Sequence, residues 1–474
     1  MNIRVKQPVI FGNCYREQPN RLCFHHFCRE VFILKWFLVA VACLIAAGAV
    51  TVYLAHYFMK TCYTSTNVTG VTAQHSDLNT YKGQLQDMGN GYSLFKQEDM
   101  TQICKTDGLT GSQQMRKHST KLVCYYTFPG PGGLVPDKID PFLCTHINIA
   151  AVGINNSKLE PLSEERQEVI KSLVGLKIRN KNLKVILSVI GMPGGFGDMV
   201  SKSSSRRMFI KDLLWTLSYY SFDGVDFDWE FPAWPGKISE RKKFIIFLKE
   251  LRDAVRKSQL NTIVSVAVAA QETIVDVSYD IPEMNKYIDY VNLMAYDYHF
   301  YTEYTPLTGP NAPLYSLPSD KGYMSTLNTN WSSLYWHDRG MPKNKIVIGI
   351  PTYGHSFWLI NAENHGWSAP ASGYGKIGSK GFVSYPEVCQ FLHSTGSKYI
   401  FDKNFEVPYA YQGLEWISYD DECSVMYKAK YIASGSYGGA MVFSLNVDDH
   451  QGVCAGTTFL LTTQIRNILG VSWQ

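Results

Sequence analysis

The sequence predicts an α/β fold, a (β/α)8 TIM barrel that carries a small α+β insertion domain and is preceded by a transmembrane helix. Three observations predict it. Beyond residue 120, eight short apolar runs alternate with mostly helical stretches, as buried parallel strands do in a closed barrel. About seventy residues separate the last two runs, which is too long for a loop. Near the N-terminus, 24 consecutive residues contain no Asp, Glu, Lys or Arg.

The uncharged stretch, residues 36–59, would span about 36 Å as a helix and could cross a bilayer with some tilt. A signal peptide is the alternative, but its apolar part is usually shorter and closer to the first residue. Residues 1–35 hold six Lys and Arg against two Glu. Because positive flanks stay in the cytoplasm, we expect a cytoplasmic tail over residues 1–35 and a single-pass type II anchor. The remainder of the chain would then be extracellular or luminal.

Residues 60–119 are polar and lack periodicity, so we interpret them as a stalk. Seven of the eleven cysteines lie beyond the uncharged stretch, and an odd number leaves at least one that is unpaired or pairs between chains. Cys62, next to the membrane, is the candidate for a disulfide-linked dimer, whereas partners for Cys389, Cys423 and Cys454 stay open. Three sequons could carry glycans in a luminal chain, at Asn67, Asn155 and Asn330.

Composition excludes several classes of protein. A hydrophobic content of 45% and a charged content of 18% are typical of a folded chain. The net charge of +4 and the lack of a basic tract give no indication of nucleic-acid binding. No CxxC or HxxxH spacing indicates zinc, and the glycine run from Gly191 lacks dinucleotide-binding spacing, so no metal or cofactor is predicted.

The barrel is assigned to residues 120–352 and 422–474, and the insertion domain to residues 353–421. The stretch from Ser163 has acids in its first turn and basic residues near its end, which complements a helix dipole. The stretch from Ser239 repeats apolar residues at helical spacing. The eight expected strands begin at Leu122, Thr145, Leu183, Gly224, Thr262, Tyr290, Lys345 and Gly438.

The fourth run, "FDGVDFDWEF", places carboxylates among bulky apolar residues. Side chains on a strand alternate, so Asp226, Asp228 and Glu230 share one face while Val225, Phe227 and Trp229 share the other. In a barrel the acids then point inward, and Glu230 lies at the C-terminal end where active sites form. Asp223 begins the strand with opposite parity, so we expect a structural or capping role for it.

Three carboxylates in a row repel one another, so at least one is expected to keep a proton with a raised pKa. A carboxylic acid that is neutral near pH 7 is what general-acid cleavage of a glycosidic bond requires. A hard-cation site and buried structural acids are the alternatives. Strand spacing aims the carboxylates along a line instead of around an ion, which disfavours the cation site.

The stretch "DGVDFDWE" resembles the D-x-x-D-x-D-x-E signature of glycoside hydrolase family 18, the chitinases and chitinase-like lectins. Supporting similarity lies in "KLVCYYT", "CTHI", "MAYDYH", "GIPTYGHSF", "PYAYQG" and "YDDECS". The resemblance covers residues 121–471 and implies retaining, substrate-assisted hydrolysis, in which the sugar's own 2-acetamido group attacks the anomeric carbon. The implied partner is chitin or an N-acetylglucosamine oligosaccharide.

The resemblance also implies roles for single residues. Glu230 would be the acid/base, Asp228 would orient the acetamido group, and Asp226 would share its proton with Asp228. Tyr296 would hydrogen-bond the acetamido oxygen beside Asp297. The residues assigned to the sugar-binding surface are Tyr125, Met192, Trp229, Met294 and Phe443. Cys124 and Cys144 match a disulfide of the family.

The chain departs from the family's pattern where that pattern has sugar-stacking aromatic residues. The departures are Pro129, Ile149 to Ala151, Ile190, Met192, Thr302 and Phe443. Fewer stacking planes should weaken the binding of a long polysaccharide. Two functions therefore compete: an active glycosidase, favoured by the complete set of acids, and a membrane-tethered lectin with little hydrolysis, favoured by the reduced aromatic surface.

Overall fold

The computed structural model describes residues 120–130, 132–191, 195–259 and 261–471. The predicted tail, membrane helix and stalk lie outside these residues, as do Cys62, Asn67 and Met192, so the anchor and the Cys62-linked dimer stay predictions. Among the described residues, none of the helices combines the length and the apolar character needed to span a bilayer.

Eight parallel strands close into a barrel in the order β1-β16-β9-β8-β7-β6-β5-β2. Each of the eight predicted runs contains one barrel strand, so the predicted (β/α)8 barrel is confirmed. The strands are β1 (Lys121–Thr127), β2 (His146–Val152), β5 (Lys184–Ile190), β6 (Gly224–Asp228), β7 (Ile263–Ala269), β8 (Tyr290–Met294), β9 (Ile346–Pro351) and β16 (Gly439–Phe443).

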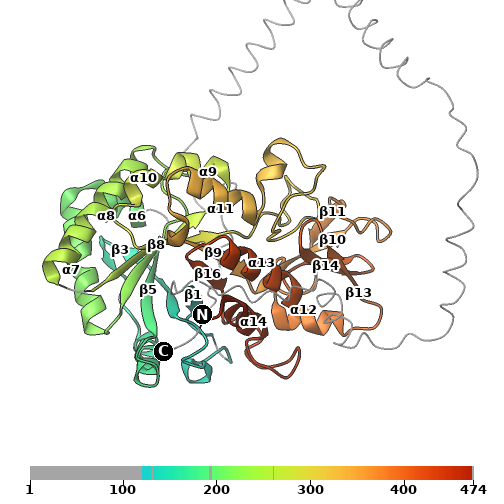
Figure 1. Ribbon diagram of the computed structural model, residues 1–474, viewed down its shortest axis with the longest axis horizontal. Helices are drawn as coiled ribbons and strands as arrows, with labels where there is room; N and C mark the ends of the chain where they lie inside the picture. Colours follow the sequence, from blue (N-terminus) through green and yellow to red (C-terminus); the bar gives the residue numbers. More distant parts are fainter. Residues whose placement is uncertain (1–119, 131, 192–194, 260, 472–474) are drawn as a thin grey trace, which may run out of the picture. The chain divides into compact units, whose positions relative to one another are not determined.

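Helices cover the outside of the barrel, with α7 and α8 beside the β5–β8 strands in Figure 1. Ser163 accepts the N–H of Arg166 and caps the first predicted helix, and α8 buries an apolar stripe that includes Phe247 and Leu251. The helices outside the insertion are α5 (Glu164–Gly175), α6 (Gly195–Ser201), α7 (Ser203–Tyr219), α8 (Ser239–Ser258), α9 (Glu272–Ser278), α10 (Ile281–Met284), α11 (Thr329–Asp338), α13 (Glu422–Ser434) and α14 (Leu460–Leu469). Short 3-10 helices span Pro136–Lys138, Leu176–Ile178, Gly322–Thr326 and Lys343–Lys345, and a small hairpin joins β3 (Ile154–Asn155) to β4 (Lys158–Leu159).

Strand parity divides the apolar residues into two separate clusters. Val225 and Phe227 belong to the large cluster between strands and helices. Tyr125, Tyr296 and Met441 belong to a smaller cluster inside the barrel. The two faces of each strand therefore meet different surroundings, as the alternation in the fourth run predicts.

An antiparallel sheet with one helix is inserted between β9 and β16, as predicted from the length of that gap. Its strand order is β11-β10-β15-β14-β13, and β12 also pairs with β10. The elements are β10 (Tyr353–Leu359), β11 (Ala371–Tyr374), β12 (Phe382–Ser384), α12 (Tyr385–Leu392), β13 (Lys398–Asp402), β14 (Val407–Gln412) and β15 (Glu415–Ser418). Because β10 follows β9 after a single residue, Thr352, the sheet starts at the C-terminal end of the barrel.

Two disulfides between described residues fix segments of this fold. Cys124 of β1 is bonded to Cys144, which precedes β2, as the family resemblance implies. Cys389 of α12 is bonded to Cys454, which lies between β16 and α14. The second bond links the insertion to the end of the barrel, a pairing that the sequence left open.

Candidate active site

The three acids of β6 form a column that runs from the barrel interior to its mouth. Asp226 is fully buried, Asp228 is half-buried, and Glu230, just past the strand end, is exposed. All three have the same strand parity, and the C-terminal ends of the parallel strands surround them. The column therefore offers one exposed carboxyl supported by two that are progressively withdrawn from water.

Asp226 is held by side chains from four other strands. Its Oδ2 accepts hydrogen bonds from Tyr125 OH at 2.6 Å and Ser188 Oγ at 3.3 Å. Its Oδ1 accepts from Ser265 Oγ at 2.6 Å and Asn292 Nδ2 at 3.0 Å. Burial raises the pKa of Asp226, and these four hydrogen bonds act in the opposite direction. Asp226 is thus held rigidly at the bottom of the column, with both of its carboxylate oxygens hydrogen-bonded.

Asp228 has a different environment. Among the described residues, no hydrogen-bond donor reaches its buried Oδ1. Burial raises the pKa of Asp228 well above its usual range, and the charges of Glu230 and Asp226 raise it further. Asp228 can therefore hold a proton, and it presents an acceptor to a group that enters from the mouth.

Glu230 stands at the mouth with a pKa near neutrality. Desolvation by the surrounding barrel is the main cause, the negative charge of Asp297 adds to it, and together they raise the pKa of Glu230 to about 7. An exposed carboxyl with such a pKa is protonated in a large fraction of molecules at neutral pH. It can give that proton to an oxygen above the column.

Asp297 lies beyond β8 and is held by the insertion domain. Its Oδ1 accepts hydrogen bonds from Tyr353 OH at 2.6 Å and His355 Nε2 at 2.7 Å, both from β10. Its backbone has a left-handed φ of 58° and donates its N–H to Asn311 Oδ1 at 3.0 Å. The first strand of the insertion therefore fixes a carboxylate of the barrel, a role for Tyr353 and His355 that sequence reasoning missed.

Aromatic side chains line the wall beside the acids. The ring of Phe443 is half-buried, with centroids 5.6 Å from Tyr125, 5.9 Å from Tyr296 and 6.3 Å from Tyr353. Tyr296 is buried, and its hydroxyl makes a long 3.9 Å contact with Met441 Sδ. Met294 packs at the edge of the same inner cluster. The structure thus brings together Tyr125, Met294, Tyr296 and Phe443, as the sequence prediction requires.

Trp229 does not belong to this wall, which corrects its assignment to the sugar-binding surface. Its ring stacks on Phe196 at 5.1 Å and meets Phe244 edge-on at 5.5 Å, in the cluster under the helices. The reason is parity: Trp229 follows the last residue of β6, Asp228, and continues the alternation of the strand, so its side chain points to the opposite face.

Other predicted positions lie away from the column. Asn155 is exposed in the β3–β4 hairpin and Asn330 is half-buried in the first turn of α11, so their glycosylation stays a prediction. Within the described ranges, no three His, Cys, Asp or Glu side chains are arranged to hold a metal ion.

Comparison with known proteins gives consistent matches. The family model "Glycosyl hydrolases family 18" matches residues 121–448. Human chitinase-3-like protein 2 is 36% identical over 370 residues, which cover 74% of this chain and 93% of that protein. The structure of human YKL-39, a pseudo-chitinase with retained chitooligosaccharide binding, is similar with a TM-score of 0.70 and 35% identity, covering 74% of this chain and all of that one. An active chitinase from Trichuris suis is similar with a TM-score of 0.69 and 33% identity, again over 74% and 100%.

Proposed function

Because the chain belongs to glycosyl hydrolase family 18, we propose that it hydrolyses β-1,4 bonds in chitin or N-acetylglucosamine oligosaccharides with retention of configuration. One observation carries the proposal: Glu230 is exposed at the barrel mouth, and its pKa of about 7 keeps a proton available there. The similar proteins include both a pseudo-chitinase and an active chitinase. Support for hydrolysis therefore comes from the three acids of this chain.

The reaction proceeds in two steps. Glu230 donates its proton to the glycosidic oxygen while the carbonyl oxygen of the substrate's 2-acetamido group attacks the anomeric carbon. The bond to the leaving sugar breaks and a cyclic oxazolinium forms. The Glu230 carboxylate then removes a proton from water, whose oxygen attacks the anomeric carbon and opens the ring, so Glu230 ends the cycle protonated.

Asp228 orients the nucleophile. Its buried Oδ1, which has no donor among the described residues, can accept the acetamido N–H and stabilise the positive charge of the oxazolinium. Four hydrogen bonds hold Asp226 below Asp228. The negative charge of Asp226 there helps to raise the pKa of Asp228. Tyr296 can donate its hydroxyl to the acetamido oxygen, because the hydroxyl contacts a weak acceptor, Met441 Sδ, at 3.9 Å.

A chitinase-like lectin is the second candidate, and the aromatic wall favours it. Phe443 is partly covered by Tyr125, Tyr296 and Tyr353, so little of its ring remains for stacking on a sugar. A relative that binds chitooligosaccharides as a pseudo-chitinase has this same overall fold. In that case the acids would bind a glycan without productive turnover.

Hydrolysis of a fluorogenic N-acetylglucosamine oligomer by the purified full-length chain separates the two candidates. Release of the fluorophore should exceed that of Glu230→Gln by at least about a hundredfold, the usual contribution of a general acid. Glu168→Gln, an equal charge change at an exposed helical site, should keep full activity. Turnover no greater than that of Glu230→Gln, with sugar binding retained in both, would refute hydrolysis and leave the lectin.

A further inference from the structure

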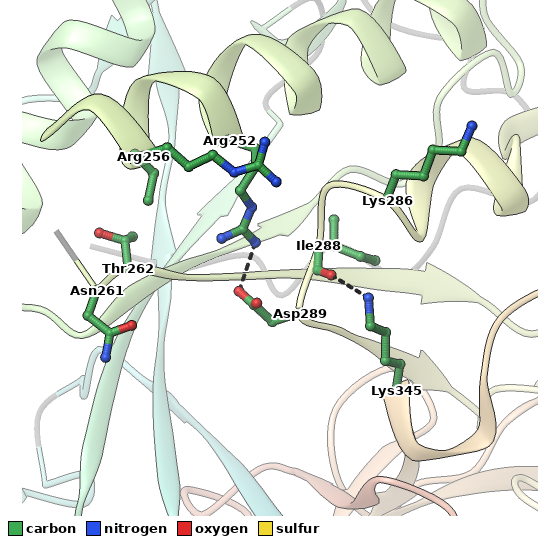
Figure 2. A pocket seen from close by; sticks show the side chains of 9 residues that line it. Arg252, Arg256, Asn261, Thr262, Lys286, Ile288, Asp289 and Lys345 are labelled. Atoms are coloured by element: carbon green, nitrogen blue, oxygen red, sulfur yellow. Dashed lines mark hydrogen bonds and ion pairs between the residues drawn. The ribbon is translucent and has the colours of Figure 1, made fainter. Parts of the chain in front are cut away.

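A basic hollow lies at the N-terminal end of the barrel, opposite the acid column. It has a volume of about 350 Å³ and lies between the end of α8 and the starts of β7, β8 and β9. Figure 2 shows the Arg252 and Arg256 guanidinium groups on one side and the Lys345 ammonium on the other. The nine lining residues are Arg252, Val255, Arg256, Asn261, Thr262, Lys286, Ile288, Asp289 and Lys345.

Two of the cations are held in place by three backbone carbonyls and one carboxylate around the hollow. Arg252 donates its Nε–H to Tyr287 O at 2.7 Å and an Nη2–H to Asp289 Oδ2 at 2.8 Å. Lys345 donates to Asn285 O at 2.8 Å and Ile288 O at 2.9 Å. These contacts engage two of the five donors of a guanidinium and two of the three of an ammonium. The groups are therefore oriented before any ligand arrives.

Positive charge exceeds negative charge in the hollow. Asp289 is the one carboxylate of the nine lining residues, and its Oδ2 also accepts the N–H of Val264 at 2.7 Å. Outside the lining residues, Lys286 pairs with Glu283 at 2.5 Å, and Arg256, whose side chain is 67% exposed, pairs with Asp253 at 3.7 Å. Four cationic side chains and one carboxylate therefore line the hollow, and that carboxylate is paired with Arg252.

The positively charged side chains around the hollow repel one another. Burial lowers the pKa of Lys345, the negative charge of Asp289 raises it, and the positive charge of Arg252 lowers it by a smaller amount. An anion in the hollow would relieve this repulsion. Cationic hydrogen-bond donors that line a hollow are suited to bind an anion whose oxygen atoms accept hydrogen bonds.

We propose that this hollow binds the phosphate or sulfate group of a small molecule, between the guanidinium groups of Arg252 and Arg256 and the ammonium of Lys345. Guanidinium groups match the geometry of such groups by paired hydrogen bonds, and an ammonium adds a point charge. The volume lies at the lower end of the range of small-molecule sites, so the hollow can hold a phosphate or sulfate group together with part of the molecule to which the group is attached. The site is separate from the acid column and does not depend on hydrolysis there.

Calorimetric titration of the full-length chain at low salt tests the proposal, with glycerol phosphate, inorganic phosphate and uncharged glycerol as probes. Glycerol phosphate should bind with one-to-one stoichiometry, and sulfate should compete with it. Arg256→Gln should weaken binding about tenfold, because it removes one charge-assisted contact. Arg256 is suited to this test because it is exposed and its loss should leave the fold intact.

Lys257→Gln is the matched control, since Lys257 is the next residue of α8, is exposed, and does not line the hollow. It should change affinity less than twofold, and both variants should unfold at the temperature of the parent chain. Equal weakening by the two variants, or no saturable binding of glycerol phosphate, would overturn the proposal. If inorganic phosphate binds but glycerol phosphate does not, the hollow is a site for the free ion, and the proposal that it binds the phosphate group of a small molecule is wrong.

Discussion

The two ends of the barrel handle charge in opposite ways. At the C-terminal end, desolvation by the surrounding barrel and neighbouring negative charges raise the pKa values of Asp228 and Glu230. At the N-terminal end, Asp223 accepts the Val185 N–H at 2.8 Å and pairs with Lys177 at 2.9 Å. Asp289 does the same with Val264 and Arg252. Among the described residues, Asp228 and Glu230 have no Lys or Arg partner, whereas Asp223 and Asp289 each have a cation and a backbone donor.

The arrangement at the N-terminal end is a repeated device. Asp223 and Asp289 each precede a barrel strand, and each also donates its own backbone N–H to the carbonyl of the residue it caps, at 2.8 Å in both cases. Thr145 acts likewise before β2, where its Oγ1 accepts the Leu122 N–H. Charges there stabilise strand starts, and charges at the other end are free to do chemistry. This division follows the general pattern of such barrels.

The largest test of the comparison is Asp228→Asn. Turnover of the fluorogenic oligomer should fall about a hundredfold, because a neutral amide cannot supply the negative charge that stabilises the oxazolinium. Stability should rise at pH 7. A carboxyl whose folded pKa is raised costs stability as pH rises from its unfolded pKa towards its folded one, and Asn removes this cost. Thermal unfolding of both proteins from pH 4 to 7 measures the gap, which should widen with pH; a variant less stable than the parent at pH 7 would contradict the comparison.

The converse test is Asp223→Ala at the other end. We expect the free energy of unfolding to fall by about 2 kcal/mol, because the Val185 N–H and Lys177 lose their acceptor. Hydrolysis should be unchanged in the remaining folded protein. Denaturant unfolding measures the loss, and Glu168→Ala, which breaks an exposed helical pair, should cost about 0.5 kcal/mol or less. Equal losses in the two variants would show that the capping arrangement adds nothing.

A smaller effect is expected from Phe443→Trp. The larger ring should extend from the tyrosine wall towards the sugar and strengthen chitooligosaccharide binding about fivefold, within the usual gain of an aromatic contact. Titration with a soluble oligomer measures this gain. Unchanged or weaker binding would mean that the surrounding tyrosines keep this position away from the sugar.

The smallest effect concerns the pH dependence of activity. The alkaline limb of kcat/KM should lie near pH 7, where Glu230 loses its proton. Asp297→Asn removes a negative charge that raises this pKa, so the limb should move to lower pH by less than about one unit. A pH profile of oligomer hydrolysis shows the shift; movement to higher pH would contradict the assigned cause.

The sequence predicted correctly those features that depend on the alternation of side chains between the two faces of a strand. Parity alone places Asp226 and Asp228 inside the barrel, and it places Trp229 outside, against the role that the family resemblance gave it. What the sequence could not predict depends on distant partners. Ser188, Ser265 and Asn292 reach Asp226 from three different strands, and His355 reaches Asp297 from the insertion. The basic hollow was missed for the same reason, because Arg252 and Lys345 lie far apart in the chain and neither forms part of a basic tract.

The Cys389–Cys454 bond has a consequence for how the chain would respond to proteases. It closes a covalent ring that contains β13, β14 and β15 of the insertion sheet, α13 and the last barrel strand. A single cut within that ring leaves both pieces attached, so the cleaved protein would migrate undivided on a gel without reductant and separate into fragments with it. A cut in the exposed turn at Gly413 would therefore nick the molecule without separating β15, α13 and β16 from the rest of the barrel.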